Sequence, residues 1–143
     1  MDYTISTDKS RLDVGVIKGF LERSYWGKHR AEETIIRTSI DNSLCYGVYD
    51  GGRQIGFARV ITDFATSYYL CDVYIDEDYR GKGVGKSLIE AITTSDELKN
   101  VQGILGTKDA HGLYEQYGFA RDAERFMRRV PDYLRERIAN GQG

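Results

Sequence analysis

Three successive segments with strand-like alternation, between residues 44 and 75, place the strongest constraint on the fold of this chain. They read LCYGVYD, RQIGFARVITD and SYYLCDVYI, and the first two flank Asp50-Gly51-Gly52, a turn sequence typical of β-hairpins. A short loop at residues 63–66 separates the second segment from the third. We therefore expect three strands that follow one another along the chain with no helix between them.

Helical periodicity lies on both sides of these strands. Before them, a short strand at DYTIST is followed by apolar spacing that predicts helices over Ser10–Arg23 and about Ala31–Ile40. After them, VGKSLIEAITTS and DAHGLYEQYGF predict two helices separated by a strand at GILGT. A last pair of strands is expected at Phe119–Ala123 and Phe126–Val130, and a final helix from Pro131. The predicted order is β-α-α-β-β-β-α-β-α-β-β plus a C-terminal helix, an α/β (α+β) fold with a mixed sheet covered by helices.

Length and composition limit the class of protein. The 143 residues predict a single domain spanning residues 1–143, and the net charge of −2 argues against general nucleic-acid binding. No apolar run reaches transmembrane length and the N-terminus is polar, so we expect a cytoplasmic protein with no membrane partner. The two cysteines lie in apolar strands and are expected to be reduced, and two scattered histidines predict no metal site.

The stretch RGKGVGKSL, from Arg80 to Leu88, joins the third strand to the next helix. Its glycines let the backbone approach a ligand closely, and the helix start adds unpaired N–H groups and the positive end of the helix dipole. Three cationic side chains lie in the same stretch. The pattern predicts a phosphate or pyrophosphate site, with a plain tight turn as the alternative. Its residues are Arg80, Gly81, Lys82, Gly83, Val84, Gly85 and Lys86.

The ending Gly85-Lys86-Ser87 also resembles the end of a nucleotide-binding P-loop, G-x-x-x-x-G-K-[ST]. The first glycine of that motif would fall at position 80, which is Arg80. A loop one residue shorter converges fewer backbone N–H groups on a phosphate, and no apolar strand ending in Asp follows. A P-loop-like nucleotide-binding protein is therefore the weaker alternative.

Two motifs resemble those of the GNAT (GCN5-related) N-acetyltransferase superfamily. VYIDEDYRGKGVG is similar to the acyl-CoA-binding signature Q/R-x-x-G-x-G/A, with Arg80, Gly83 and Gly85 at the matching positions. AHGLYEQYGF is similar to the A-x-x-L-Y-x-x-x-G-F segment of the later helix, and the element order also resembles that of small bacterial single-domain members. The resemblance implies a GNAT-like fold, with acetyl-CoA (coenzyme A) as co-substrate, no metal, and the glycine loop around its pyrophosphate.

The resemblance also implies roles for residues outside the loop. Backbone groups of Val73, Tyr74 and Ile75 would bind the pantetheine arm and polarise the thioester carbonyl, and such a donor is worth about 3–4 kcal/mol in other acyl-transfer enzymes. Tyr114 occupies the position of the general acid for the leaving thiolate, although a packed core tyrosine is the alternative. Thr107 stands where family members often carry an Asn that contacts the pantetheine arm.

The acceptor and the base are less constrained. By resemblance the acceptor is a primary amine of a small molecule or peptide, attacking directly in a ternary complex. Asp72, beside the expected thioester, is the first candidate base, and a structural carboxylate with ordered water as base is the alternative. In SYWGKHR, Trp26 and Arg30 are expected to hold an acceptor's apolar body and carboxylate, unless Trp26 only anchors the loop.

Two further questions stay open at this level. A non-catalytic module that senses acyl-CoA would need the glycine loop but neither Tyr114 nor a base. Family members are often dimers, so a homodimer is one expected assembly, but no long apolar surface stripe in the sequence indicates it.

Overall fold

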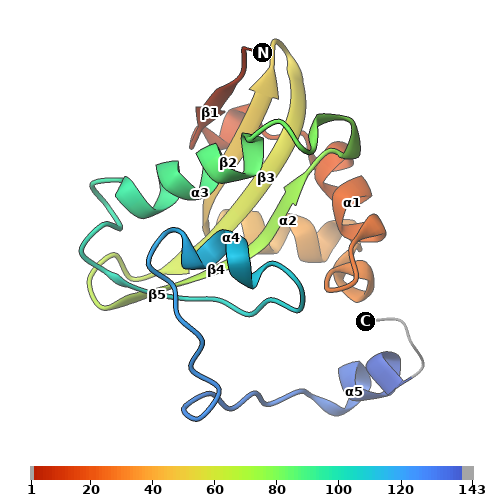
Figure 1. Ribbon diagram of the computed structural model, residues 1–143. Helices are drawn as coiled ribbons and strands as arrows, with labels where there is room; N and C mark the ends of the chain where they lie inside the picture. Colours follow the sequence, from red (N-terminus) through yellow and green to blue (C-terminus); the bar gives the residue numbers. More distant parts are fainter. Residues whose placement is uncertain (1, 140–143) are drawn as a thin grey trace.

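A five-stranded mixed sheet, in the order β1-β2-β3-β4-β5, organises the chain (Figure 1). The computed structural model describes residues 2–139. Neighbouring strands are antiparallel except β4 and β5, which run parallel. The strands are β1 (Thr4–Ser6), β2 (Leu44–Asp50), β3 (Arg53–Thr62), β4 (Ser67–Ile75) and β5 (Gln102–Ile104).

The three predicted strands in series are confirmed as β2, β3 and β4. Asp50 pairs with Arg53 across a two-residue turn, and Gly51 has a φ of +58°, which glycine adopts without steric cost. At the next turn Asp63 accepts hydrogen bonds from the backbone N–H groups of Ala65 (2.9 Å) and Thr66 (2.8 Å). Local turn chemistry therefore sets this part of the topology.

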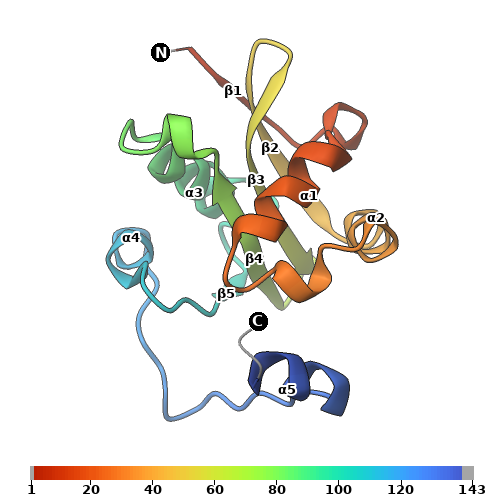
Figure 2. The same ribbon diagram turned by 90° about the vertical axis from the view of Figure 1, so that its right-hand side faces the viewer.

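Helices cover both faces of the sheet (Figure 2). Helices α1 and α2 lie against one face, and α3 and α4 lie on the other. Asp13 caps α1 by accepting a hydrogen bond from the N–H of Val16 at 3.1 Å, so the predicted first helix begins later than Ser10. The helices are α1 (Val14–Arg23), α2 (Glu33–Asp41), α3 (Val84–Thr94), α4 (His111–Glu115) and α5 (Asp132–Ala139), with short 3₁₀ turns η1 (Lys9–Arg11), η2 (Lys28–Arg30) and η3 (Glu77–Tyr79).

Each face has its own apolar core. On one side Ile17 and Phe20 of α1 pack with Phe57 of the sheet, and on the other Leu88 and Ile92 of α3 are fully buried. Burial of each such side chain contributes roughly 1.5–3 kcal/mol. The two cores hold the sheet between the helices and leave its β4–β5 end to form a cleft.

A β-bulge interrupts β4 at Asp72. Phe57 lies opposite Tyr74 and Arg59 lies opposite Cys71, so two residues of β4 face one residue of β3. Asp72 has a φ of +53°, a left-handed conformation that Asp adopts more readily than most residues. The extra residue changes which face of the sheet the side chains of β4 point to. Even-numbered side chains pack toward α3 before the bulge and toward α1 and α2 after it.

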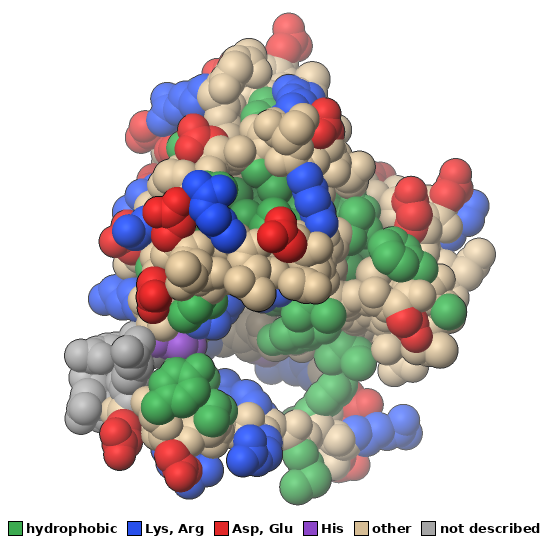
Figure 3. Space-filling model, turned by 180° about the vertical axis from the view of Figure 1, so that it is seen from behind, with side chains coloured by type: hydrophobic (Ala, Val, Ile, Leu, Met, Phe, Trp, Pro, Cys, Tyr) green, Lys and Arg blue, Asp and Glu red, His purple; other side chains and the backbone are tan. Residues whose placement is uncertain are grey.

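The prediction of a last strand pair was wrong for the described residues. Residues 119–131, here called the C-terminal arm, contain no strand and lead from α4 to α5 below the rest of the molecule (Figure 1). In the space-filling view the lower segment stands apart from the main body (Figure 3). Residues 120–129 are all exposed, and within the described residues no strand lies beside them to supply the hydrogen-bond partners that a further strand requires. The final helix is confirmed, with Pro131 directly before α5.

Candidate active site

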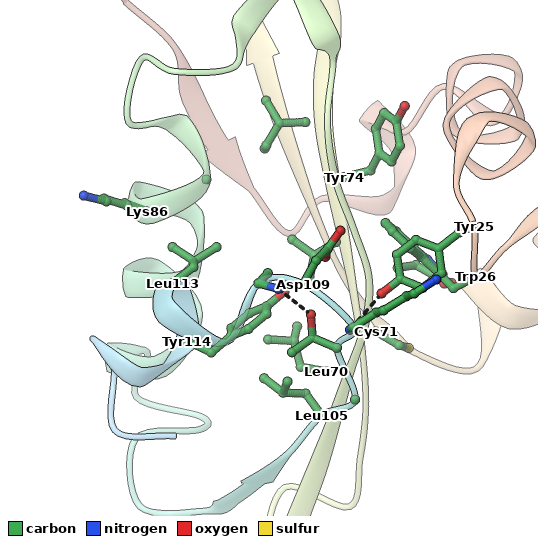
Figure 4. A pocket seen from close by; sticks show the side chains of 18 of the residues that line it. Tyr25, Trp26, Leu70, Cys71, Tyr74, Lys86, Leu105, Asp109, Leu113 and Tyr114 are labelled. Carbon is green, nitrogen blue, oxygen red and sulfur yellow. Dashed lines mark hydrogen bonds between the residues drawn. The ribbon is translucent and has the colours of Figure 1, made fainter. Parts of the chain in front are cut away.

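A cleft opens where β4 and β5 separate (Figure 4). The two strands pair only between Ser67–Tyr69 and Gln102–Ile104, so within the described residues no strand flanks β4 on its β5 side from Leu70 to Ile75, while β3 pairs with its other side. The cleft measures about 990 Å³, a volume typical of small-molecule sites. Its walls are β4, the glycine loop with the start of α3, the β5–α4 connection, α4 and the loop after α1.

The glycine loop forms one end of the cleft. Gly81 and Gly83 have φ angles of +77° and +82°, and a Cβ at either position would meet no atom within 4 Å. Backbone conformation, rather than crowding, therefore requires glycine there. Gly83 begins α3 without a side-chain cap, so the first N–H groups of the helix have no carbonyl partner in that helix. The loop can bind an anion through these donors and the helix dipole.

The cations of the loop are held in different ways. Arg80 donates from Nε to the carbonyl of Ile75 (3.0 Å), and its guanidinium lies 4.8 Å from the ring centre of Tyr74. Lys86 lines the rim and points outward (Figure 4). Lys82 is turned toward the ring of Tyr79, at 5.6 Å, and does not line the cleft. Of these three cations, Arg80 is therefore the one that a hydrogen bond holds at the cleft.

Tyr114 projects from α4 into the cleft and is 9% exposed. Burial, followed by the nearby Tyr25 and Asp109, raises the pKa of the Tyr114 phenol to about 12. The ring also packs edge-on against Phe119, with centroids 6.0 Å apart. At neutral pH the phenol is protonated, so its hydroxyl can donate a hydrogen bond or a proton.

The β5–α4 connection supplies Thr107, whose Oγ1 accepts a hydrogen bond from the N–H of Ala110 at 3.0 Å. This bond orients the start of α4 and leaves the hydroxyl hydrogen of Thr107 as a donor. Cys71 also lines the cleft, and burial raises the pKa of its thiol to about 12. Both cysteines are free, as expected, and a protonated Cys71 thiol is a poor nucleophile.

Aromatic rings form the wall opposite α4. Trp26 lies edge-on to Tyr25, with centroids 4.9 Å apart, and 6.2 Å from the ring of Tyr74. The hydroxyl of Tyr25 accepts a hydrogen bond from the backbone N–H of Lys108 at 3.0 Å (Figure 4). This bond joins the loop after α1 to the β5–α4 connection, so the two walls of the cleft are tied to each other.

A buried ion-pair cluster lies beside this wall. Asp72, in β4, accepts hydrogen bonds from Arg30 Nη2 (2.8 Å) and Nη1 (3.3 Å) and from Arg59 Nε (3.0 Å). Arg59 also donates from Nη1 to Ser43 Oγ at 3.1 Å. Burial opposes the charge on Asp72, but the hydrogen bonds and charges of the two arginines outweigh it and lower the pKa of the carboxyl.

The cleft brings together most of the residues that sequence reasoning selected. Lys82 and Arg30 do not line it, although Arg30 binds the cleft-lining Asp72. Sequence reasoning missed Tyr25 and Arg59. Tyr25 adjoins the selected Trp26, and Arg59 is a single charge within the apolar run IGFARVI, a pattern that indicates a buried, paired cation.

Comparisons with known proteins agree with this geometry. A family model described as an acetyltransferase (GNAT) domain matches residues 41–121. The crystal structure of a protein from Xanthomonas campestris pv. campestris, described as belonging to the GNAT family, is 38% identical, with a TM-score of 0.87. The match covers 94% of this chain and 96% of that one. This chain belongs to the GNAT acetyltransferase family.

Curated relatives carry acetyltransferase names. GCN5-related N-acetyltransferase 2, chloroplastic, of Arabidopsis thaliana is 30% identical over 98 residues, covering 64% of this chain and 38% of the relative. Serotonin N-acetyltransferase 2, chloroplastic, of Oryza sativa subsp. japonica is 25% identical over 129 residues, covering 85% and 64%. The matches thus span less than two thirds of the length of these relatives. A structure from Clostridium acetobutylicum with acetyl-CoA shares the fold, with a TM-score of 0.66 at 13% identity.

None of the helices within residues 2–139 has both the length and the apolar character needed to cross a membrane. The same range contains no group of three or more His, Cys, Asp and Glu side chains placed to hold a metal ion.

Proposed function

We propose that this protein transfers an acetyl group from acetyl-CoA to a primary amine of a small molecule or peptide, by direct attack in a ternary complex. The observation that carries the proposal is the cleft itself, where the glycine loop, the unpaired edge of β4 and Tyr114 meet. Membership of the GNAT family and the neighbour solved with acetyl-CoA support the choice of donor.

The donor fits the cleft in two parts. The first N–H groups of α3, the open backbone at Gly81 and Gly83, and the fixed Arg80 suit a pyrophosphate. The free edge of β4 at residues 73–75 offers backbone groups to the pantetheine arm and the thioester carbonyl, because no strand satisfies them on that side. Thr107 adds a hydroxyl donor on the facing wall.

In the transfer, the amine nitrogen attacks the thioester carbonyl carbon, a C–N bond forms, and the C–S bond breaks. The amine loses one proton, and the coenzyme A sulfur leaves with the electron pair of the broken bond. With a pKa of about 12, Tyr114 is protonated at neutral pH and donates a hydrogen bond to the sulfur as it becomes anionic; when that proton moves to the sulfur, the phenolate takes up a replacement proton from solvent water. Tyr114 is therefore our proposed acid.

The contacts of Asp72 favour the structural alternative over the base. Two guanidinium groups occupy both carboxylate oxygens, at 2.8–3.3 Å, and the lowered pKa makes the group a weaker proton acceptor. We propose that ordered water takes the amine proton instead.

The first experiment is a calorimetric titration with acetyl-CoA, with Mg-ATP as the comparison ligand. Saturable binding of acetyl-CoA alone supports the donor site, and binding of ATP alone would refute it in favour of the nucleotide-binding alternative. Release of coenzyme A thiol with a panel of amines then separates an enzyme from an acyl-CoA sensor. A sensor would bind acetyl-CoA and acetylate no amine.

We also propose a homodimer, for which the C-terminal arm is the supporting feature. Phe126 (54%), Met127 (99%) and Tyr133 of α5 (62%) are exposed, as Figure 3 shows for the hydrophobic side chains along this segment. The sheet ends at β5, so the outer edge of β5 is open, and the same chain carries an arm that pairs with no strand in the described residues. In a two-fold dimer, the arm of each copy can pair with the open edge of the other copy. Sedimentation equilibrium tests this assembly.

A further inference from the structure

The Arg30–Asp72–Arg59 cluster holds more positive than negative charge. Two guanidinium groups face one carboxylate, and within residues 2–139 neither arginine has an ion pair with any other acid. The third contact of the cluster, Ser43 to Arg59, is with a neutral hydroxyl. Among the described residues, one positive charge of the cluster therefore has no acidic partner beside the cleft.

Burial makes this surplus costly. The side chains of Asp72 and Arg59 are 3% and 10% exposed, whereas that of Arg30 is 29% exposed. A charge taken out of water without a partner is strongly destabilising, so a protein retains such a group when solvent or a ligand compensates it. Arg30 is the member through which solvent or a ligand can reach the cluster.

The hydrogen bonds of Arg30 leave one edge of its guanidinium open. A guanidinium has five N–H donors in a fixed plane, and Arg30 uses Nη1 and Nη2 to bind Asp72. No hydrogen bond from its Nε is found in the described part of the chain. Arg30 Nη2 lies 2.8 Å from Oδ1 of Asp72, and Asp72 lines the cleft, so Arg30 lies next to the cleft wall.

We propose that Arg30 binds a carboxylate on the acceptor, so that the substrate class is an amine carrying a carboxylate, with its apolar body against Trp26. Asp72 and Arg59 are positioning residues in this scheme: Asp72 holds the guanidinium plane of Arg30, and Arg59 holds Asp72. A planar fork matches a carboxylate through two parallel hydrogen bonds. This inference rests on the proposed acetyl transfer and assigns its acceptor.

The test compares each amine acid with its own carboxamide, for example phenylalanine with phenylalaninamide and tyrosine with tyrosinamide. The readout is the ratio of kcat/KM for acid over amide, from coenzyme A release. The amine of the carboxamide is less basic than that of the acid, so a larger fraction of it is neutral and able to attack at a given pH. A preference for the acid therefore cannot arise from amine ionisation. A charge-assisted hydrogen-bond pair predicts a wild-type ratio of about 10–100.

Variants locate the origin of the ratio. Arg30→Gln is expected to lower it to about 1, and Arg30→Lys, which keeps the charge but not the fork, to an intermediate value. Arg37→Gln, on the exposed Arg37–Glu33 pair of α2, is the matched control and should leave the ratio unchanged. Because both acceptors are assayed on one preparation, a partly unfolded variant does not distort the ratio.

Asp72→Asn separates positioning from proton abstraction. As a positioning residue, Asp72 acts on the acid-over-amide ratio through Arg30, so Asp72→Asn should lower that ratio toward 1, whereas loss of a general base would lower kcat/KM for acid and amide alike and leave the ratio unchanged. A wild-type ratio near 1, or a ratio that Arg30→Gln leaves unchanged, would overturn the carboxylate assignment while acetyl transfer stands. If wild-type protein acetylates no amine at all, the proposed function fails first, and the assignment of its acceptor falls with it.

Discussion

Replacing Asp72 with Asn tests the ion-pair cluster through the free energy of unfolding. Asn keeps the size of the side chain and tolerates the φ of +53°, so the backbone of the bulge is preserved. The substitution places an amide NH₂ against a guanidinium donor and leaves the buried Arg59 and the half-buried Arg30 without their carboxylate. Removing one partner of a buried ion pair costs about 3–5 kcal/mol, which is the expected loss at pH 7.

The same loss should depend on pH. Burial opposes ionisation of Asp72, but its hydrogen bonds with Arg30 and the charges of both arginines hold its pKa below the ordinary value. A carboxyl with a lowered folded pKa adds stability above its unfolded pKa of about 3.9, and that stability is lost as the pH falls through the folded pKa. The difference between wild type and Asp72→Asn should therefore be full at pH 7 and shrink below about pH 4.

Urea unfolding followed by far-ultraviolet circular dichroism, at pH 7 and at low pH, measures both quantities. Glu33→Gln removes a carboxylate from an exposed pair that is 2.8 Å long, and should cost less than about 1 kcal/mol. A loss below about 1 kcal/mol for Asp72→Asn at pH 7, or a loss of equal size at both pH values, would refute a charged, buried Asp72.

Three other predictions concern the donor site, the acid and the assembly. Gly83→Ala forces a side chain into a φ of +82°, so acetyl-CoA binding measured by calorimetry should weaken by about 10-fold, whereas Gly52→Ala in the hairpin turn should have no effect. Tyr114→Phe should lower kcat by about 10²-fold with acetyl-CoA binding retained, and unchanged kcat would remove Tyr114 from the mechanism. Met127→Glu, at a side chain that is 99% exposed, should shift the protein to monomer in sedimentation equilibrium; a wild-type monomer would contradict the proposed assembly.

Local chemistry explains which elements could be predicted from the sequence. Turns such as Asp50-Gly51-Gly52 and the loop at Gly81 and Gly83 require backbone conformations that glycine adopts, so residue type alone indicates them. The bulge at Asp72 could not be predicted, because an alternating pattern does not show where an extra residue enters a strand. Burial of Arg59 likewise depends on Asp72 across the sheet.

The C-terminal arm shows the other limit. Apolar residues such as Phe126 and Val130 suit a strand by composition, but a strand forms only where another strand supplies hydrogen bonds. The strand at the end of the sheet, β5, has only three residues and offers few backbone groups for a further strand to pair with. Sequence pattern therefore indicates the capacity to pair and not the partner.

Trp26 gives this chain an optical reporter at its cleft. It is the single tryptophan in the sequence, lies on the cleft wall, and contacts the rings of Tyr25 and Tyr74. Its emission therefore comes from one place, and a ligand that enters beside it replaces the water around the indole. Occupancy of the acceptor side can be followed by intrinsic fluorescence, without a label and without turnover.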